Sequence, residues 1–205
     1  MAAIIFDFDG TISDSFDYVA GFLAAEAHLQ TLSSEQKHEL RGRSMFAMAR
    51  QLGHPWWRLP SLFWKGRRLM AKAIKHVKPF TDMPTVIKKL HAEGHELFIV
   101  SSNSVTNVRA FLHEHNLHTY FLEIYGGVVF NKASALKRLL KEQRLDPDSA
   151  VYIGDELRDV RAAESAKLRV VAVTWGFAKS AELEALRPTA MVRQPIDLLH
   201  VLEEL

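Results

Sequence analysis

Two aspartates, Asp7 and Asp9, follow an apolar run near the start of the chain and are separated by one residue. Carboxylates at positions i and i+2 of a strand lean toward the same side, where like charges repel unless a cation joins them or one is protonated. Magnesium is a hard ion that binds carboxylates, and a carboxyl with a raised pKa can donate a proton. The pair therefore suits a nucleophilic aspartate that attacks phosphorus beside a general acid. The sequence DFDG alone also fits a polar strand end that turns at Gly10.

Polar side chains of complementary chemistry follow three other apolar runs. They are Ser101, Ser102 and Asn103 after the second run, Lys132 after the third, and Asp155, Glu156 and Asp159 after the fourth. Parallel sheets bind ligands outside the carboxyl ends of their strands, so we expect these side chains along one rim. Phosphoryl transfer needs cations and donors around the oxygens over which charge spreads, which this set supplies.

The elements that must position these residues are short apolar runs alternating with helical patterns. The expected strands are Ala3–Phe8, Glu96–Ser101, Ile124–Phe130, Ala150–Gly154 and Arg169–Thr174. The expected helices between them are Pro84–Glu93, Val105–His115, Lys132–Arg144 and Leu157–Ser165. Nearly continuous hydrophobicity is typical of strands covered on both faces, so the pattern predicts an α/β fold with a Rossmann-like, doubly wound parallel sheet. Residues 189–205 predict a short strand and a helix that covers one sheet face.

The segment from Ser13 to about Pro79 has no strand-like run. Its helical patterns are Asp17–Gln30, Ser34–Arg41, Met45–Leu52 and Leu59–Val77, with a serine cap expected within Leu32–Gln36. This pattern predicts an inserted all-helical cap domain over the rim. We expect a core of residues 1–13 and 80–205, and a cap of residues 14–79.

The four polar motifs, in this order and at strand ends, resemble those of the haloacid dehalogenase superfamily over essentially the whole chain. The family pattern is DxDGT, a strand ending in Ser or Thr, a lysine, and GDxxxD. The helical insert lies where the family carries its C1 cap. Residues Gly154–Phe177 are similar to the phosphoglycolate phosphatase-like branch.

The resemblance assigns a role to each matching residue. It implies that Asp7 is the nucleophile, that Asp9 is the general acid and base, and that Lys132 neutralises charge on the nucleophile and the phosphate. The implied Mg²⁺ ligands are Asp7, Asp9 through its backbone carbonyl, and Asp155. The implied phosphate-binding groups are Ser101, Ser102, Asn103 and Lys132. Asp159 and Glu156 would act indirectly, by orienting water bound to magnesium.

The presence of Asp9 favours phosphate-ester chemistry, because dehalogenation leaves no oxygen to protonate. The resemblance thus implies a magnesium-dependent phosphatase that acts on a small phosphorylated metabolite through an aspartyl-phosphate at Asp7. A phosphomutase of the β-phosphoglucomutase type shares the same core residues. A non-enzymatic binding or regulatory protein is expected to lack some of them.

Substrate choice should lie in the cap. Arg41 and Arg43 lie at a helix junction where an arginine could bind a carboxylate or a second phosphate, although both could also be solvated. The segment Pro55–Arg68 mixes three tryptophans with basic residues. Such a pattern can stack nucleobases, and cap tryptophans can also form a dimer contact. We expect packing of these tryptophans against neighbouring helices.

Composition sets further bounds. The chain has 205 residues, a net charge of +2 and no cysteine, which excludes disulfides and thiolate sites and fits a reducing cytoplasm. The charge balance does not indicate a nucleic-acid partner. No apolar run approaches a membrane span, and no targeting segment is expected. We expect a cytoplasmic monomer or homodimer without a membrane partner.

Overall fold

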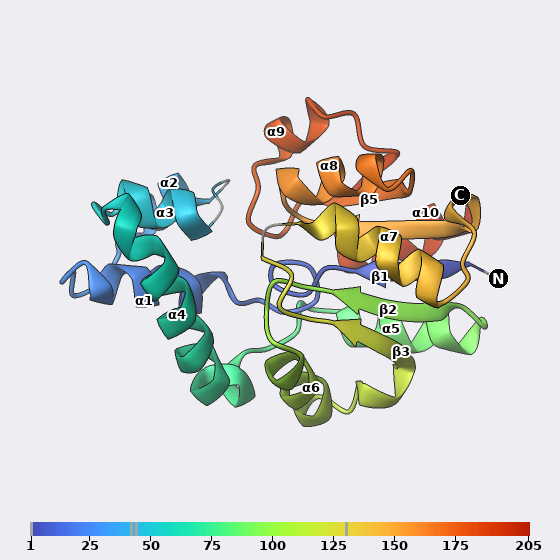
Figure 1. The fold of residues 1–205 in the computed structure, drawn as a ribbon, viewed down its shortest axis with the longest axis horizontal. Coiled ribbons are helices and arrows are strands. Elements are labelled where there is room, and N and C mark those ends of the chain that lie inside the picture. Colours follow the sequence, from blue (N-terminus) through green and yellow to red (C-terminus); the bar gives the residue numbers. More distant parts are fainter. Residues whose placement is uncertain (1, 42, 44, 130) are drawn as a thin grey trace.

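The computed structural model describes residues 2–205 except 42, 44 and 130 (Figure 1). Its strands are β1 (Ala3–Phe6), β2 (Glu96–Val100), β3 (Phe121–Tyr125), β4 (Ala150–Gly154), β5 (Arg169–Val173) and β6 (Ala190–Val192). The α-helices are α1 (Phe16–Glu26), α2 (Ser34–Leu40), α3 (Met45–Gln51), α4 (Leu59–Ala73), α5 (Met83–Ala92), α6 (Val105–Glu114), α7 (Lys132–Glu142), α8 (Leu157–Ser165), α9 (Ser180–Glu184) and α10 (Leu198–Glu203). Short 3-10 helices cover Trp56–Arg58, Ile74–His76, His118–Tyr120, Pro147–Ser149 and Pro195–Asp197. Within the described residues, no helix is long and apolar enough to cross a membrane.

The strands form one parallel sheet in the order β3-β2-β1-β4-β5-β6. The chain moves outward from β1 to β2 and β3, then returns to place β4 on the other side of β1. In the register of the sheet, Phe6 of β1 lies beside Ile99 on one side and Ile153 on the other. The strand order therefore reverses between β1 and β4, and such a reversal opens a crevice at the carboxyl ends of the strands.

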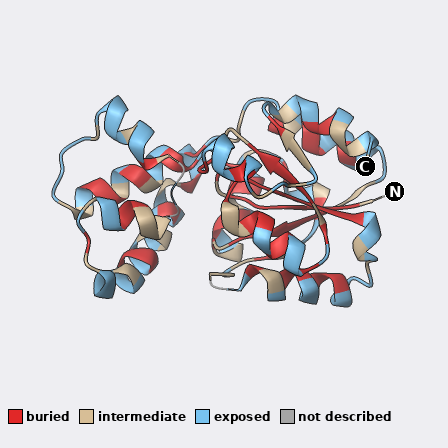
Figure 2. Cartoon of the chain, turned by 90° about the horizontal axis from the view of Figure 1, so that it is seen from above, coloured by how far each residue is buried: buried red, intermediate tan, exposed pale blue. Residues whose placement is uncertain are grey.

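Both faces of the sheet are buried, as the continuous apolar runs predict (Figure 2). Ile4 and Phe6 contribute to the cluster that packs against α5, α6 and α10, while Ala3 and Ile5 contribute to the cluster under α7 and α8. This alternation is the period-two geometry of a strand. The predicted doubly wound α/β fold is confirmed, and so are the strand and helix expected in the tail.

The inserted helices α1 to α4 lie apart from the sheet in Figure 1, and they form an apolar cluster that Phe177 of the core also joins. Phe16, Leu23, Leu40, Met48 and Leu62 are among its buried members. Two segments join this helical cap to the core, and they meet where Ser13 and Pro79 form an isolated antiparallel bridge. The expected serine cap is Ser33, whose side chain and that of Gln36 form a reciprocal capping box at the start of α2.

The third strand differs from its prediction. The sequence predicts Ile124–Phe130, but β3 ends at Tyr125, and Phe130 lies outside the described residues. Gly126 and Gly127 end the strand, since a Cβ on Gly126 would lie 2.5 Å from the amide nitrogen of Val105, and Gly127 has φ +77°. The backbone after β3 therefore turns toward the loop that follows β2 instead of extending the sheet.

Candidate active site

Asp7 is the first residue after β1 and is almost fully buried, with 2% of its surface exposed. Its amide donates a hydrogen bond to the carbonyl of Ile153, which anchors it beside β4 (2.8 Å). The chain then turns, because the Phe8 carbonyl accepts hydrogen bonds from the amides of residues 11, 12 and 13, and Gly10 adopts φ +86°. The expectation that Asp7 and Asp9 lean together from one strand is wrong, since the strand ends before both.

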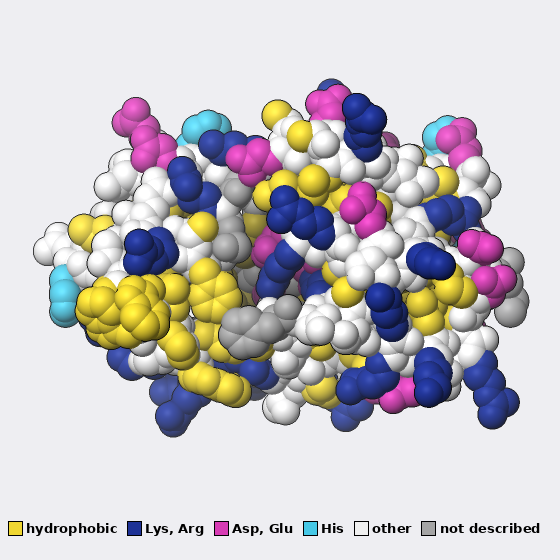
Figure 3. All heavy atoms as spheres, turned by 45° about the horizontal axis from the view of Figure 1, so that its top comes forward, with side chains coloured by type: hydrophobic (Ala, Val, Ile, Leu, Met, Phe, Trp, Pro, Cys, Tyr) yellow, Lys and Arg dark blue, Asp and Glu magenta, His cyan; other side chains and the backbone are white. Residues whose placement is uncertain are grey.

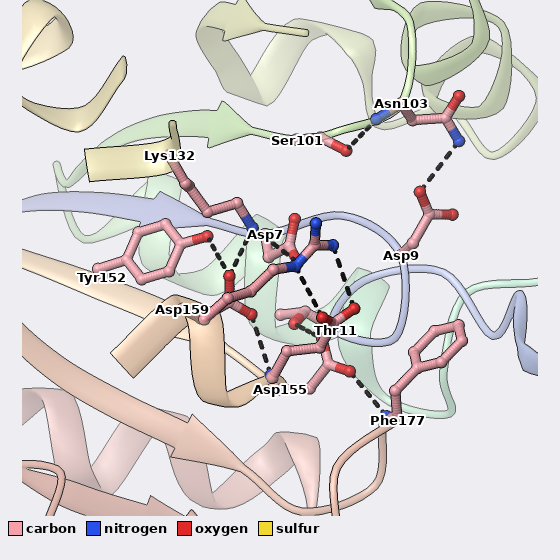
Figure 4. A network of polar contacts seen from close by, with 12 residues as sticks. Asp7, Asp9, Thr11, Ser101, Asn103, Lys132, Tyr152, Asp155, Asp159 and Phe177 are labelled. Carbon is pink, nitrogen blue, oxygen red and sulfur yellow. Dashed lines mark hydrogen bonds and ion pairs between the residues drawn. The ribbon is translucent and has the colours of Figure 1, made fainter. Parts of the chain in front are cut away.

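The carboxylates that gather at this point come from two different βα junctions (Figure 4). Asp7, Asp155 and Asp159 each offer an oxygen within 4.8 Å of the other two, and all three are buried. Because β1 and β4 are neighbours, residues after β1 and after β4 come together although they are far apart in the sequence. The crevice predicted from the strand order therefore holds an acidic cluster.

Asp155 is fixed by donors from two loops. The Thr11 hydroxyl donates to Oδ1 and the Phe177 amide donates to Oδ2, each at 2.7 Å. Ideal Cβ atoms at Gly10 and Gly176 would lie 2.2 and 2.3 Å from Asp155 Oδ2, so both positions need glycine. This close cradle holds the carboxylate in one orientation.

Asp159 connects the cluster to a buried lysine. Lys132 Nζ lies 2.5 Å from Asp159 Oδ1 and 3.0 Å from Asp7 Oδ2, and the Tyr152 hydroxyl donates to the same Asp159 oxygen at 3.3 Å. The other oxygen of Asp159 accepts the Glu156 amide at the start of α8 (3.0 Å). Asp159 thus positions Lys132 against Asp7.

A second cation, Arg158, was not singled out in the sequence. Its guanidinium pairs with Glu156, with Nε 2.7 Å from Oε2 and Nη2 donating to Oε1 at 3.1 Å. The signal for it was its position between Asp155 and Asp159 in the same motif, on the first turn of α8. Thr11, Tyr152 and Phe177 were also missed, because their contacts join distant parts of the chain.

Asp9 lies on the side of the crevice that faces the second strand. Its Oδ2 accepts a hydrogen bond from Asn103 Nδ2 at 3.0 Å, and the Ser13 hydroxyl lies 3.5 Å from Oδ1. Ser101 is fully buried, and its hydroxyl accepts the Asn103 amide (2.9 Å), while Ser102 lines the cavity beyond. The residues after β2 therefore hold Asp9 and offer polar groups near it.

Burial controls the protonation of these groups. Burial raises the pKa of Asp7 to about 7, against the attraction of Lys132, and it also raises the pKa of Asp9. Burial and the neighbouring charges of Asp7 and Asp159 raise the pKa of Asp155 well above its ordinary value. The pKa of Asp159 moves down, since Lys132 and Arg158 outweigh its burial. Asp7, Asp9 and Asp155 therefore bind protons, or a cation in their place, more readily than ordinary carboxylates. Asp159 stays ionised.

The donor set fits a divalent metal ion. Asp7 Oδ2 is buried and accepts no hydrogen bond from the described residues, and Lys132 Nζ lies 3.0 Å from it. The three clustered carboxylates, Asp7, Asp155 and Asp159, face Lys132, which leaves two negative charges when all four groups are ionised, and Arg158 pairs instead with Glu156. Hard oxygen donors with this excess charge match Mg²⁺ or a similar ion.

A cavity of about 340 Å³ lies between the cap and the core, and Asp9, Ser102, Asn103 and Arg158 line its core end. The described arginine that the cap contributes to its lining is Arg67. The structure places Arg41 over the Phe16 ring at 4.2 Å and near the Gly176 carbonyl, and Arg43 is exposed with Nε bonded to the Glu39 carbonyl.

The expected packing of the cap tryptophans is wrong. Trp56, Trp57 and Trp64 are 68, 65 and 61% exposed. Figure 3 shows hydrophobic side chains gathered on the surface of the cap. Trp56 and Trp57 contact each other edge to face, and Trp64 contacts Phe63 in the same way. The exposure of Trp64 follows from the orientation of α4, which turns Leu62, Phe63 and Met70 inward.

The fold and the carboxylate cluster define a class of α/β enzyme with its site at the reversal of strand order. The chain belongs to the haloacid dehalogenase-like hydrolase family, whose model matches residues 4–173. It is 32% identical to the phosphoglycolate phosphatase of Synechococcus elongatus over 100% of this chain and 99% of that protein. It is 26% identical to the phosphoglycolate phosphatase of Aquifex aeolicus, covering 99% and 97%.

Solved structures agree with this fold. A hydrolase of the haloacid dehalogenase-like family from Streptococcus pneumoniae superposes with a TM-score of 0.81 at 22% identity, over 98% of each chain. The family and the curated relatives identify the chain as a hydrolase of the phosphatase kind. The confirmed predictions are the family resemblance and the phosphatase class.

The raised carboxyl pKa values predict a pH-dependent metal effect on stability. Because Asp7 titrates near 7 in the fold and near 3.8 otherwise, the metal-free folded protein holds more protons, and its stability falls as pH rises toward 7. The lowered pKa of Asp159 changes the stability of the fold only below about pH 4. In thermal melts at one fixed Mg²⁺ concentration, set to 100 times the Kd at pH 8, we expect Tm to rise by about 5–10 °C at pH 8 and by less at pH 5.5. An equal shift at both pH values would contradict this.

Proposed function

We propose that this protein is a magnesium-dependent phosphatase that hydrolyses a small phosphate monoester through an aspartyl-phosphate on Asp7. The observation that carries the proposal is the buried contact of Asp7 with Lys132 within the Asp7, Asp155 and Asp159 cluster. Asp7, Asp155 and the Asp9 carbonyl would hold Mg²⁺. The bound ion would screen the charge of the phosphate and of Asp7.

Side chains of the protein carry out the remaining steps of the reaction. An Asp7 oxygen attacks phosphorus, so that a phosphorus–oxygen bond forms to Asp7 and the bond to the leaving oxygen breaks. Lys132 stabilises negative charge on Asp7 and the phosphoryl oxygens, and the polar groups around Ser101 donate to the same oxygens. Asp9, whose raised pKa favours the protonated form, gives its proton to the leaving oxygen. It then takes a proton from the water that attacks phosphorus, and the bond between phosphorus and the Asp7 oxygen breaks to release phosphate.

The similarity to named phosphoglycolate phosphatases makes phosphoglycolate the first substrate to test. Its carboxylate would need a cation beyond the phosphate site. Arg67 and Arg158 line the cavity there, whereas the predicted Arg41 and Arg43 do not appear among its described lining residues.

Phosphate release from phosphoglycolate, sugar phosphates, nucleotides and alkyl phosphates tests the proposal. We expect turnover with Mg²⁺ and its loss with excess chelator, restored when Mg²⁺ is added back. Turnover that is unaffected by chelator would contradict the metal dependence. Interconversion of sugar phosphates that depends on an added bisphosphate, without phosphate release, would indicate a mutase.

A further inference from the structure

The cavity between cap and core begins at the proton donor. Asp9, Ser102 and Asn103 form its inner end, and Phe177 lies beside them. If Asp9 protonates the leaving oxygen, as the proposed function requires, the rest of the leaving group must extend from Asp9 into this cavity. The walls of the cavity therefore indicate which leaving groups fit.

The wall that the cap supplies is apolar. It comes from α1 and α4, and its side chains include Val19, Phe22, Ala25, Phe63, Leu69 and Met70. The apolar surface continues outward, because Leu69 is 47% exposed. Figure 3 shows hydrophobic side chains gathered on the cap beside the hollow between the two parts.

The polar side chains described on this wall contact other groups of the cap. Glu26 pairs with Lys65 at 3.0 Å, and the Tyr18 hydroxyl donates to the His76 carbonyl at 3.1 Å. The guanidinium of Arg67 lies over the rings of Phe63 and Trp64, at 5.6 and 5.2 Å from their centroids. A two-carbon carboxylate would leave most of this wall in water, whereas an apolar group would cover it. Covering it is favourable because apolar surface is removed from water.

We infer that the preferred substrates are phosphate monoesters of apolar alcohols, with an alkyl or aryl-alkyl leaving group that lies against α1 and α4. This inference rests on the proposed function, because it uses Asp9 to place the leaving oxygen. The cavity volume of about 340 Å³ is within the range of sites that enclose small organic ligands.

A series of primary alkyl phosphates tests the inference, because ethyl, n-butyl, n-octyl and 2-phenylethyl phosphates share one kind of leaving oxygen. Chain length then changes only the contact with the wall. We expect kcat/KM to rise by about threefold for each added methylene that contacts the wall. The value for n-butyl phosphate should be at least about tenfold that for ethyl phosphate, with 2-phenylethyl phosphate higher still.

Two cap variants and a matched control test whether the chain-length dependence of kcat/KM comes from the cap wall. Phe22→Ala removes a ring from the wall, and Ala25→Asp, at an exposed position of α1 that lines the cavity, adds a charge to it. Each should lower the ratio of kcat/KM for n-octyl to ethyl phosphate by about tenfold. Leu29→Ala changes an exposed cap residue outside the described cavity lining and should keep the parent ratio. Because the ratio compares two substrates on one sample, a partly unfolded variant does not alter it.

The outcomes separate the two proposals. Magnesium-dependent hydrolysis of ethyl phosphate or phosphoglycolate with no gain from chain length would overturn the apolar substrate class and leave the phosphatase standing. A chain-length preference that survives both cap variants would also overturn it. Absence of phosphate release from every compound would instead reject the proposed function.

Discussion

Replacing Asp7 by asparagine is expected to lower kcat for phosphate release by at least about 10⁴-fold, because an amide cannot form the covalent link to phosphorus. The backbone contact of Asp7 with Ile153 does not involve the side chain, and Lys132 keeps Asp159 as a partner. The variant should therefore fold. Acid-quenched samples should show a phosphoryl group on the Asp7 peptide of the parent protein and none in Asp7→Asn.

A matched control separates loss of chemistry from loss of structure. The melting temperatures of Asp7→Asn and the parent should agree within a few degrees in the absence of metal. The substitution loses the ion pair with Lys132, but it also removes the repulsion between Asp7 and the neighbouring carboxylates of Asp155 and Asp159. Asp146→Asn, at an exposed carboxylate before β4, should retain full activity. Turnover by Asp7→Asn within tenfold of the parent would exclude Asp7 as the nucleophile.

Replacing Asp9 by asparagine should have an effect that depends on the leaving group. An alkyl alcohol needs a proton as it leaves, so kcat for ethyl phosphate should fall by about 10²–10⁴-fold. Para-nitrophenolate leaves without a proton, so Asp7 should still be phosphorylated rapidly by nitrophenyl phosphate. Stopped-flow absorbance should then show a burst of about one equivalent of nitrophenolate, followed by slow turnover, because the variant also lacks the base that activates water.

The hydrogen bond from Asn103 to Asp9 supplies the control for this result. An asparagine at position 9 can still accept from Asn103 Nδ2, so the geometry of the loop after β2 is preserved. Equal losses of kcat for ethyl and nitrophenyl phosphates, with no burst, would show that Asp9 does not act as the acid. Such a result would move the proton donor elsewhere in the crevice.

The architecture could be predicted from the sequence because it depends on local, periodic signals. Continuous apolar runs such as Ile4–Phe6 and Val151–Ile153 occur where strands are buried on both faces, and the helical segments between them require parallel pairing. The positions of Asp7, Ser101, Lys132 and Asp155 after successive runs then place them at one edge. The structure does bring Asp7, Lys132 and Asp155 into one crevice.

Features that depend on packing between distant segments were not accessible in the same way. The end of β3 at Tyr125 follows from the close approach of Gly126 to Val105, which no local pattern records. The exposure of Trp64 follows from the direction in which α4 turns its other apolar residues. A window of sequence shows which residues are apolar but not which of two apolar faces finds a partner.

The sequence by itself determined the elements, their order and the chemical types available at the carboxyl edge of the sheet. The tertiary structure decided which of these groups meet: Asp7 gathers with Asp155 and Asp159, while Asp9 turns to Asn103. It also decided that Arg67 lines the cavity between cap and core. The physical reason is that these contacts depend on the order of strands and on how the cap is oriented over the crevice. Both are set by the burial of apolar surface across the whole chain, not by neighbouring residues.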